Sequence, residues 1–202
     1  TATSTDRAFT IGAGGATIAA SGTGSLTFST PGVTLAYGTP NQVRSLTLTG
    51  SSSASLVNTF GKVIANNGSG ATSLTKSGSN TWALSAANTY TGPTTVAAGT
   101  LALTAGSLGS TAISVSTGAT LSVLTAGTYG TGATGAGTAG ASLSLGAGSV
   151  FSMANDGGAG LLTLGQQDSF VGAGLTIGSA NNADPRVRMI FDLGSGANNT
   201  DT

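Results

Sequence analysis

The most constraining feature of this chain is a series of very short runs in which apolar and small polar residues alternate, each ended by Gly, Asn, Ser or Pro. From Leu74 to Leu103 the large apolar residues recur two apart or singly among Thr and Ser, as in β-strands. The intervening turns contain residues that tolerate a positive φ or, in the case of Pro93, fix their own φ. Such short strands suit a chain that winds and stacks coil upon coil. The pattern predicts an all-β fold, a right-handed parallel β-solenoid (β-helix).

Composition supports the same fold. The 202 residues include 34 Gly, only 6% are charged, and Glu, His and Cys are absent. The alanines are interrupted by Gly, Ser and Thr, so that no segment has the propensity of a stable helix. Thr and Val favour pleated strands, whereas Gly and Ser favour corners. We therefore expect essentially no helix and many turns.

The segment from Leu74 to Leu103 contains a Leu-x-Lys-x-Gly run, an Ala-Asn-Thr-Tyr-Thr-Gly corner, and Thr-Thr-Val and Gly-Thr-Leu strands. In these motifs it resembles the autotransporter-associated β-strand repeat, a motif of bacterial secreted surface proteins. The residues that form this structural repeat motif are Lys76, Gly78, Trp82, Leu84, Asn88, Thr89, Tyr90, Thr91, Gly92, Val96, Gly99 and Leu101. Asn80, Ala86 and Pro93 depart from the family pattern. The chain contains one full copy.

The resemblance implies a function as well as a fold. It implies a non-enzymatic structural or adhesive segment of a secreted protein, located outside the bacterial cell or on its surface. Partners expected for such a segment are the continuation of a longer chain, a surface glycan or a host protein.

Weaker runs of the same kind extend over the rest of the chain. They predict strands at residues 8–11, 16–19, 25–28, 33–37, 44–49, 54–57, 62–64, 112–115, 120–124, 143–145, 150–153, 161–164, 175–177 and 186–193. No linker or charge run divides them, so residues 1–202 are expected to form a single solenoid segment, of nine or ten coils if each takes about 20 residues. The Gly-rich stretch at 126–141 predicts a projecting loop, with an irregular final coil as the alternative.

The two ends of the predicted solenoid suggest self-association. A solenoid needs polar caps, and neither terminal segment has residues that could fold over an apolar end. Residues 186–193 predict the longest strand, and exposed strand edges attract further strands. The candidates for end-to-end contact are Phe9, Ile11, Val187, Met189, Phe191 and Leu193. An extracellular filament, assembled end to end by strand pairing, is therefore the alternative function.

The residues needed for most active sites are missing. Without His and Cys, ordinary nucleophilic triads and zinc sites are excluded. A polysaccharide-acting β-helix enzyme, the second alternative, would need clustered carboxylates beside Lys or Arg. The available candidates are Asp156, Asp168, Asp184 and Asp192, with Arg186 and Arg188. Asp156 and Asp184 lie in turn sequences, where an Asx side chain bonding its own backbone explains them better.

Metal, nucleic-acid and membrane sites are not expected either. Calcium at Asp156, Asp168 or Asp201 would need several converging oxygen ligands, and no Gly-Gly-x-Gly-x-Asp run occurs. A net charge of zero offers no field for nucleic acid. No apolar run approaches the roughly 18 residues of a membrane span. We therefore predict no catalytic residue, cofactor or metal, no nucleic-acid partner and no membrane insertion.

The remaining candidates are aromatic and amide side chains. Trp82 alternates with Leu84 and should be interior. Tyr90 lies in a corner, where it either packs against the neighbouring coil or stands exposed as an anchor for sugar or protein. The asparagines expected to form ladders between coils are Asn66, Asn67, Asn88, Asn181 and Asn182.

Overall fold

The structure is a computed structural model that describes residues 2–104, 108, 112–123, 127–130, 143–153, 160–163, 175–177 and 188–191. In these ranges the regular elements are all β-strands, and the prediction of an all-β fold is confirmed. None of the described elements is a helix with the length and hydropathy needed to cross a membrane. The short strands follow directly from the sequence, because Gly and polar turn residues end each alternating run.

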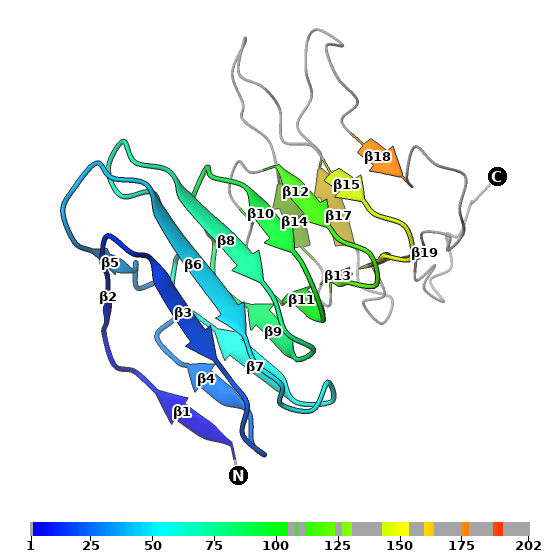
Figure 1. Ribbon diagram of the computed structural model, residues 1–202, viewed down its shortest axis with the longest axis horizontal. Helices are drawn as coiled ribbons and strands as arrows, with labels where there is room; N and C mark the ends of the chain where they lie inside the picture. Colours follow the sequence, from blue (N-terminus) through cyan, green and yellow to red (C-terminus); the bar gives the residue numbers. More distant parts are fainter. Residues whose placement is uncertain are drawn as a thin grey trace, which may run out of the picture.

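Two long sheets form the body of the molecule (Figure 1). The eight-stranded sheet has, in spatial order, β1 (Thr3–Thr5), β4 (Leu26–Phe28), β7 (Val57–Phe60), β9 (Thr81–Leu84), β11 (Thr100–Leu103), β13 (Thr120–Val123), β16 (Val150–Met153) and β19 (Arg188–Phe191). The seven-stranded sheet has β3 (Ala16–Ala19), β6 (Arg44–Thr49), β8 (Thr72–Lys76), β10 (Thr94–Val96), β12 (Ile113–Val115), β15 (Leu143–Leu145) and β18 (Leu175–Ile177). Successive strands of the chain alternate between the two sheets, so each coil contributes one strand to each.

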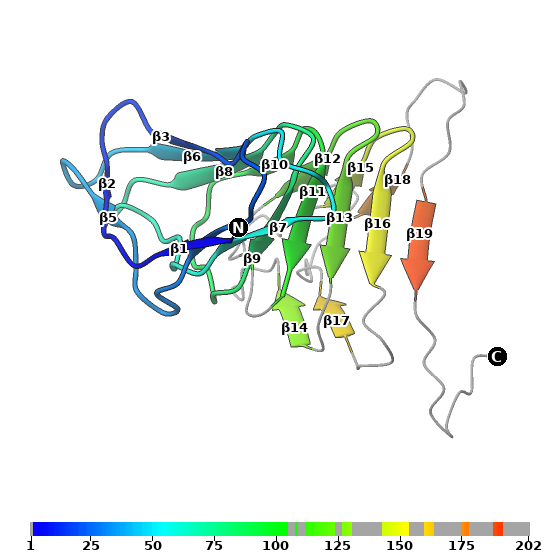
Figure 2. The ribbon, with the colours of Figure 1, turned by 90° about the horizontal axis from the view of Figure 1, so that it is seen from below.

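A third side of the coil is made of shorter pairings. Here β2 (Thr10–Ile11) pairs with β5 (Ala36–Tyr37), and β14 (Gly127–Gly130) pairs with β17 (Gly160–Thr163). Single bridges join Thr34 to Val63 and Asn88 to Leu108. All of these pairings are parallel, as are those of the long sheets, and Figure 2 shows the coils stacked along one axis. The prediction of a parallel β-solenoid is confirmed.

The corner that leads from the seven-stranded to the eight-stranded sheet contains a glycine with positive φ in coil after coil. These glycines are Gly50, Gly78, Gly99, Gly118 and Gly148. The left-handed region costs a residue with a Cβ roughly 1–2 kcal/mol, and Gly avoids this cost. At Gly99 a Cβ would also lie only 2.5 Å from the carbonyl oxygen of Gly78 in the preceding coil. Glycine therefore allows both the turn and the close stacking of coils.

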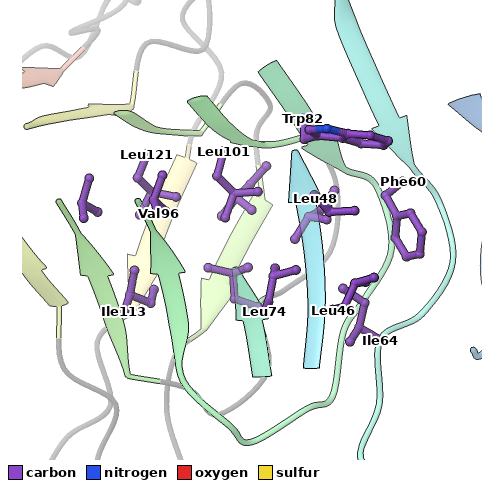
Figure 3. Close-up of a cluster of buried hydrophobic side chains, with 14 of the residues drawn as sticks. Leu46, Leu48, Phe60, Ile64, Leu74, Trp82, Val96, Leu101, Ile113 and Leu121 are labelled. Atoms are coloured by element: carbon purple, nitrogen blue, oxygen red, sulfur yellow. The ribbon is translucent and has the colours of Figure 1, made fainter. Parts of the chain in front are cut away.

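The core lies between the sheets and runs the length of the described coils (Figure 3). Trp82, Leu101 and Leu121 are neighbours in register on the eight-stranded sheet. They face an interior that also holds Leu48 and Val96 of the seven-stranded sheet. Full burial of such a side chain stabilises the fold by roughly 1.5–3 kcal/mol. A single coil buries only a few of them, so its stability depends on its neighbours.

Three expectations about the strands and coils require correction. Residues 54–56 form a turn, the strand expected at 54–57 begins only at Val57, and the strand expected at 62–64 is reduced to a single bridge at Val63. Thr81 pairs with Thr100 and Thr100 with Thr120, which gives coils of about 20 residues, but Val150 pairs with Arg188, in a coil almost twice as long. The described residues contribute at most eight strands to one sheet, which is fewer than the nine or ten coils expected if each took about 20 residues.

The third correction concerns the Gly-rich stretch at 126–141. Its residues Gly127–Gly130 form β14, which pairs along its length with β17, so this part is a strand of the solenoid's third side. Backbone groups alone make a parallel ladder, and Gly supplies them without any alternation of side chains. Residues 131–141 lie outside the described ranges.

Candidate functional site

The repeat motif at residues 74–103 occupies the centre of the solenoid and contributes mainly to its interior. Trp82, Leu84, Val96 and Leu101 are all buried, and their strands pair with coils on both sides. Trp82 lies above Leu48 in the core (Figure 3), and its indole nitrogen donates a hydrogen bond of 3.0 Å to the carbonyl of Thr49. The polar part of Trp82 is thereby satisfied inside the protein.

Lys76 is the most unusual residue of the motif. It stands in register between Leu48 and Val96, in a column that otherwise holds apolar side chains, and it is fully buried. Its ammonium donates hydrogen bonds to the carbonyls of Ser77 (2.7 Å), Gly78 (2.9 Å) and Ala98 (3.0 Å). Burial lowers the pKa of Lys76 to about 8. Three carbonyl acceptors favour the charged form and act in the opposite direction.

These contacts give Lys76 a structural role. Ser77 and Gly78 belong to its own corner, whereas Ala98 belongs to the corner of the next coil. The ammonium therefore joins two stacked corners at carbonyls that the strands leave unpaired. The missing side chain of Gly99 leaves room for it, since a Cβ there would lie 2.9 Å from the Lys76 Nζ.

Asn80, a departure from the repeat family, connects three coils. Its Nδ2 donates to the carbonyls of Ala20 (3.0 Å) and Thr49 (3.1 Å), which belong to the first two coils. A glycine at this position would have no side chain to make these bonds. The sequence comparison within the motif marks Asn80 as different, but the partners come from strands some 30 and 60 residues earlier, which the motif does not include.

The corner from Asn88 to Gly92 alternates between buried and exposed residues. Tyr90 is fully buried and its hydroxyl lies 2.6 Å from the Thr94 hydroxyl, so the packed alternative holds and the exposed anchor does not. Asn88 Oδ1 accepts a bond from the Ile64 amide (2.9 Å). Thr89 has an exposed side chain. A Cβ on Gly92 would lie 2.4 Å from the Thr72 carbonyl oxygen, so only glycine fits there.

Two adjacent asparagines of one corner, Asn66 and Asn67, bond groups of neighbouring coils. Asn66 accepts bonds from the amides of Thr72 (3.1 Å) and Thr91 (2.9 Å) and donates to the Thr91 hydroxyl (2.9 Å). Asn67 donates to the carbonyls of Thr39 (2.8 Å) and Gln42 (3.1 Å). Side-chain amides therefore satisfy backbone groups between coils, and a ladder of stacked asparagines stays a prediction. Asn181 and Asn182 lie outside the described ranges.

Asn58 has a comparable role that the sequence did not indicate. It is fully buried beside Trp82 in the inward column of the eight-stranded sheet. Its Oδ1 accepts from the Leu26 amide (2.9 Å), and its Nδ2 donates to the Thr81 carbonyl (2.9 Å). The strand expected at 54–57 ended before Asn58, so its inward position was missed.

The residues expected to make end-to-end contact lie in different environments. Ile11 is fully buried, and Phe9 packs on Phe28 with ring centroids 5.7 Å apart. Neither presents an exposed apolar side chain, because both point into the first coil. Met189 and Phe191 belong to β19, the last strand of the eight-stranded sheet. Val187 and Leu193 lie outside the described ranges.

The residues considered for an enzyme active site or a calcium site lie outside the described ranges, with the exception of Arg188. The residues concerned are Asp156, Asp168, Asp184, Asp192, Asp201 and Arg186. Arg188 begins β19, in register with Val150. Within the described ranges, no group of three or more Asp, Glu, His or Cys could hold a metal ion.

Comparison with known proteins supports the resemblance at the motif. Residues 74–103 match the model of the family described as passenger-associated-transport-repeat. The chain is also similar to the protein named Adhesin BmaC autotransporter of Brucella suis biovar 1 (strain 1330), with 38% identity over 101 residues. That alignment covers 50% of this chain but only 3% of the relative. No solved structure matches the chain.

The residues of this match are the ones whose geometry is described above, from the Lys76 corner through the buried Tyr90 to the Gly99 turn. The matched range and the sequence motif coincide. The prediction of an autotransporter-type repeat is therefore confirmed, and residues 74–103 form a passenger-associated transport repeat of the kind found in autotransporter passengers.

Proposed function

We propose that this chain is a non-enzymatic adhesive segment of a secreted bacterial surface protein. The observation that carries the proposal is the repeat at residues 74–103, together with the similarity to a protein named as an autotransporter adhesin. The stacked coils support a mechanical part of the role, since each coil is joined to the next by two long parallel sheets. Such a rod holds an adhesive surface away from the cell.

The buried polar contacts favour a scaffold over a reactive centre. Lys76, Asn80 and Tyr90 are all buried, and their hydrogen bonds go to neighbouring backbone or side-chain groups. These contacts stabilise corners rather than lining an open cleft. We therefore expect adhesion to reside on the outer faces of the solenoid.

Surface display on a non-adherent bacterium tests the proposal. The chain, fused to an autotransporter translocator, should reach the surface, be detected by antibody on intact cells and raise cell retention on glass or host cells several-fold. A translocator without the chain is the control for export. Normal display without increased retention would contradict the adhesive role.

The N-terminal edge supports a second candidate, the end-to-end assembly expected from the sequence. Strands β1, β2 and β3 each stand last in their sheets, so their outer backbone groups have no strand partner among the described residues. Such an edge can accept another strand. With Ile11 buried, this contact would be made by backbone hydrogen bonds.

A further inference from the structure

Asn67 and Gly68 form the only Asn-Gly dipeptide of the sequence. In a chain that is free to change its conformation this dipeptide rearranges by itself, because glycine has no Cβ to hinder the approach of its nitrogen to the asparagine side chain. The Gly68 nitrogen loses its proton to hydroxide and attacks Asn67 Cγ. The new N–Cγ bond forms, the Cγ–Nδ2 bond breaks, and the leaving nitrogen takes a proton from water and departs as ammonia. Water then opens the cyclic imide to aspartate or isoaspartate.

The fold holds Asn67 in a position that opposes this reaction. The residue is only 6% exposed, and its Nδ2 donates to the carbonyls of Thr39 (2.8 Å) and Gln42 (3.1 Å) in the preceding coil. Its backbone is fixed as well, since its amide donates to the Gly70 carbonyl (2.9 Å) and its carbonyl accepts from the amides of Gly70 (3.0 Å) and Asn41 (3.0 Å). Ring closure needs the side-chain amide to rotate, so the two bonds of Nδ2 have to break first.

The same corner requires both residues of the reactive pair. Gly68 has a φ of 63°, and a Cβ at this position would collide with Asn41 Oδ1. Asn41 Oδ1 is itself held in place, because it accepts a bond from the Ser69 amide (3.0 Å). At Asn67 a side chain with two N–H donors serves two carbonyls. Neither residue can therefore be exchanged for one that reacts more slowly without a loss of contacts.

Modification at Asn67 removes the contacts between the two coils. Aspartate has no N–H to donate, so the carbonyls of Thr39 and Gln42 lose a donor and face a carboxylate. Isoaspartate leads the main chain through the side chain, which displaces the carbonyl that accepts from the amides of Asn41 and Gly70. We propose that Asn67 is a self-deamidation site that the stacked coils suppress, and that a chain modified there no longer stacks its coils at this corner. Time spent unfolded is thereby recorded irreversibly in the chain.

Asn66 provides a matched control one residue away. It is followed by Asn67, whose Cβ hinders ring closure. Its Oδ1 accepts from the amides of Thr72 (3.1 Å) and Thr91 (2.9 Å), and its Nδ2 donates to the Thr91 hydroxyl (2.9 Å). A carboxylate at this position can still accept from both amides, and the hydroxyl can turn to donate to it. Asn66→Asp therefore adds the same charge as deamidation of Asn67 but keeps its contacts.

Peptide mapping by mass spectrometry, with enzymatic methylation of isoaspartate, measures the reaction at Asn67 in the full chain. The chain is held in mildly alkaline buffer, once folded and once in guanidinium chloride. A synthetic peptide of residues 62–72 in both solutions gives the effect of the denaturant itself. Because at least two hydrogen bonds must break first, the folded chain should react at least about tenfold more slowly than the denatured chain. In the denatured chain Asn66 should react more slowly than Asn67.

Refolding after removal of the denaturant tests the consequence for the fold. Chains held denatured in mildly acidic buffer, where the Gly68 amide keeps its proton, should recover their circular dichroism. Chains held equally long in alkaline buffer should lose recovery in proportion to the fraction modified at Asn67, and the refolded material should lack the modified peptide. Asn67→Asp should melt at a lower temperature than wild type or fail to fold, whereas Asn66→Asp should melt like wild type.

Three results would each overturn the inference. These are equal rates of modification at Asn67 in the folded and the denatured chain, refolding of modified chains as complete as that of unmodified ones, and equal stability of Asn67→Asp and Asn66→Asp. Every measurement uses the isolated chain and none depends on adhesion. The proposed function is therefore supported or rejected separately, by the display experiment.

Discussion

The indole nitrogen of Trp82 donates a hydrogen bond to the carbonyl of Thr49, although the two residues lie in different coils. The same carbonyl accepts from the Ala20 amide (2.9 Å) and from Asn80 Nδ2 (3.1 Å). One acceptor therefore connects three coils, and it keeps two donors if one of the three is removed. This relationship separates the packing role of Trp82 from its hydrogen-bonding role.

Replacing Trp82 should distinguish these two roles. Trp82→Phe keeps most of the buried ring and leaves the Thr49 carbonyl with two donors, so it should cost about 1 kcal/mol. Trp82→Ala empties the space between Leu48 and Leu101 and should cost about 3–5 kcal/mol. Urea unfolding checks both values. Equal losses for the two variants would show that the hydrogen bond, and not the ring, carries the stability.

The buried ammonium of Lys76 predicts an unusual pH dependence. Its pKa is lowered to about 8 in the folded chain from 10.5, so the unfolded chain binds the proton more tightly between these values. Stability should therefore rise with pH in that window. It should be lost again as the pH falls through 8.

Melting curves of the wild type and of Lys76→Met across this range provide the measurement. Lys76→Met has no proton to lose and should show no such rise. Burial raises the pKa of Tyr37 and Tyr90, so their contribution is present at lower pH and is lost above pH 10. A wild type that loses stability steadily from pH 8 to pH 10 would contradict the Lys76 prediction.

A charge at Leu84 should unfold the centre of the solenoid. Leu84 is buried and in register with Phe60 and Leu103, so Leu84→Asp places a carboxylate among apolar side chains and should cost several kcal/mol. Thr89→Asp, at an exposed position, is the matched control. Limited proteolysis should cut the first variant within the repeat and spare the second. Equal resistance of the two variants to proteolysis would contradict the inward position of Leu84.

Circular dichroism should show β-structure with negligible helix. Gly, Ser and Thr interrupt every potential helix, and the described residues contain none. A helical fraction above about a fifth would refute the solenoid.

End-to-end assembly stays a prediction that sedimentation and electron microscopy can check over a concentration series. Phe191→Lys places a charge in β19, the last strand of its sheet, and should shorten any filament. A double variant combines it with Val187→Lys in the same segment. Thr89→Lys should have no effect. A monomer at every concentration, unchanged by these substitutions, would leave only a segment of a longer rod.

The fold could be predicted from the sequence wherever the position of a residue depends only on the alternation of apolar and polar residues around it. Alternation placed Leu46, Leu48, Leu84 and Leu101 inward, because large apolar residues two apart point to the same face of a strand. It failed for Asn58, whose partners Leu26 and Thr81 belong to other coils. Register between coils is a non-local property, and a single sequence carries little information about it.

The same holds for the candidate site, where the motif could be predicted but the contacts between coils could not. The motif identified the Lys76 corner, but not that its ammonium binds three carbonyls, because Ala98 comes within reach only when coils stack. Tyr90 was left open for the same reason, since its burial depends on the neighbouring coil. The Gly-rich strand β14 had no side-chain pattern, as its pairing with β17 uses backbone groups.

The stacked glycine corner has a consequence for how such proteins diversify. In the coils with Gly78, Gly99, Gly118 and Gly148 the corner between the two long sheets stays short, whereas the connection from β13 to β15 contains many more residues than that from β9 to β10. The additional residues of this coil therefore belong to the opposite side, in the connection from the eight-stranded to the seven-stranded sheet. Insertions there leave strand register intact, so variation acquired during evolution, or loops grafted by an engineer, would be presented along that single edge.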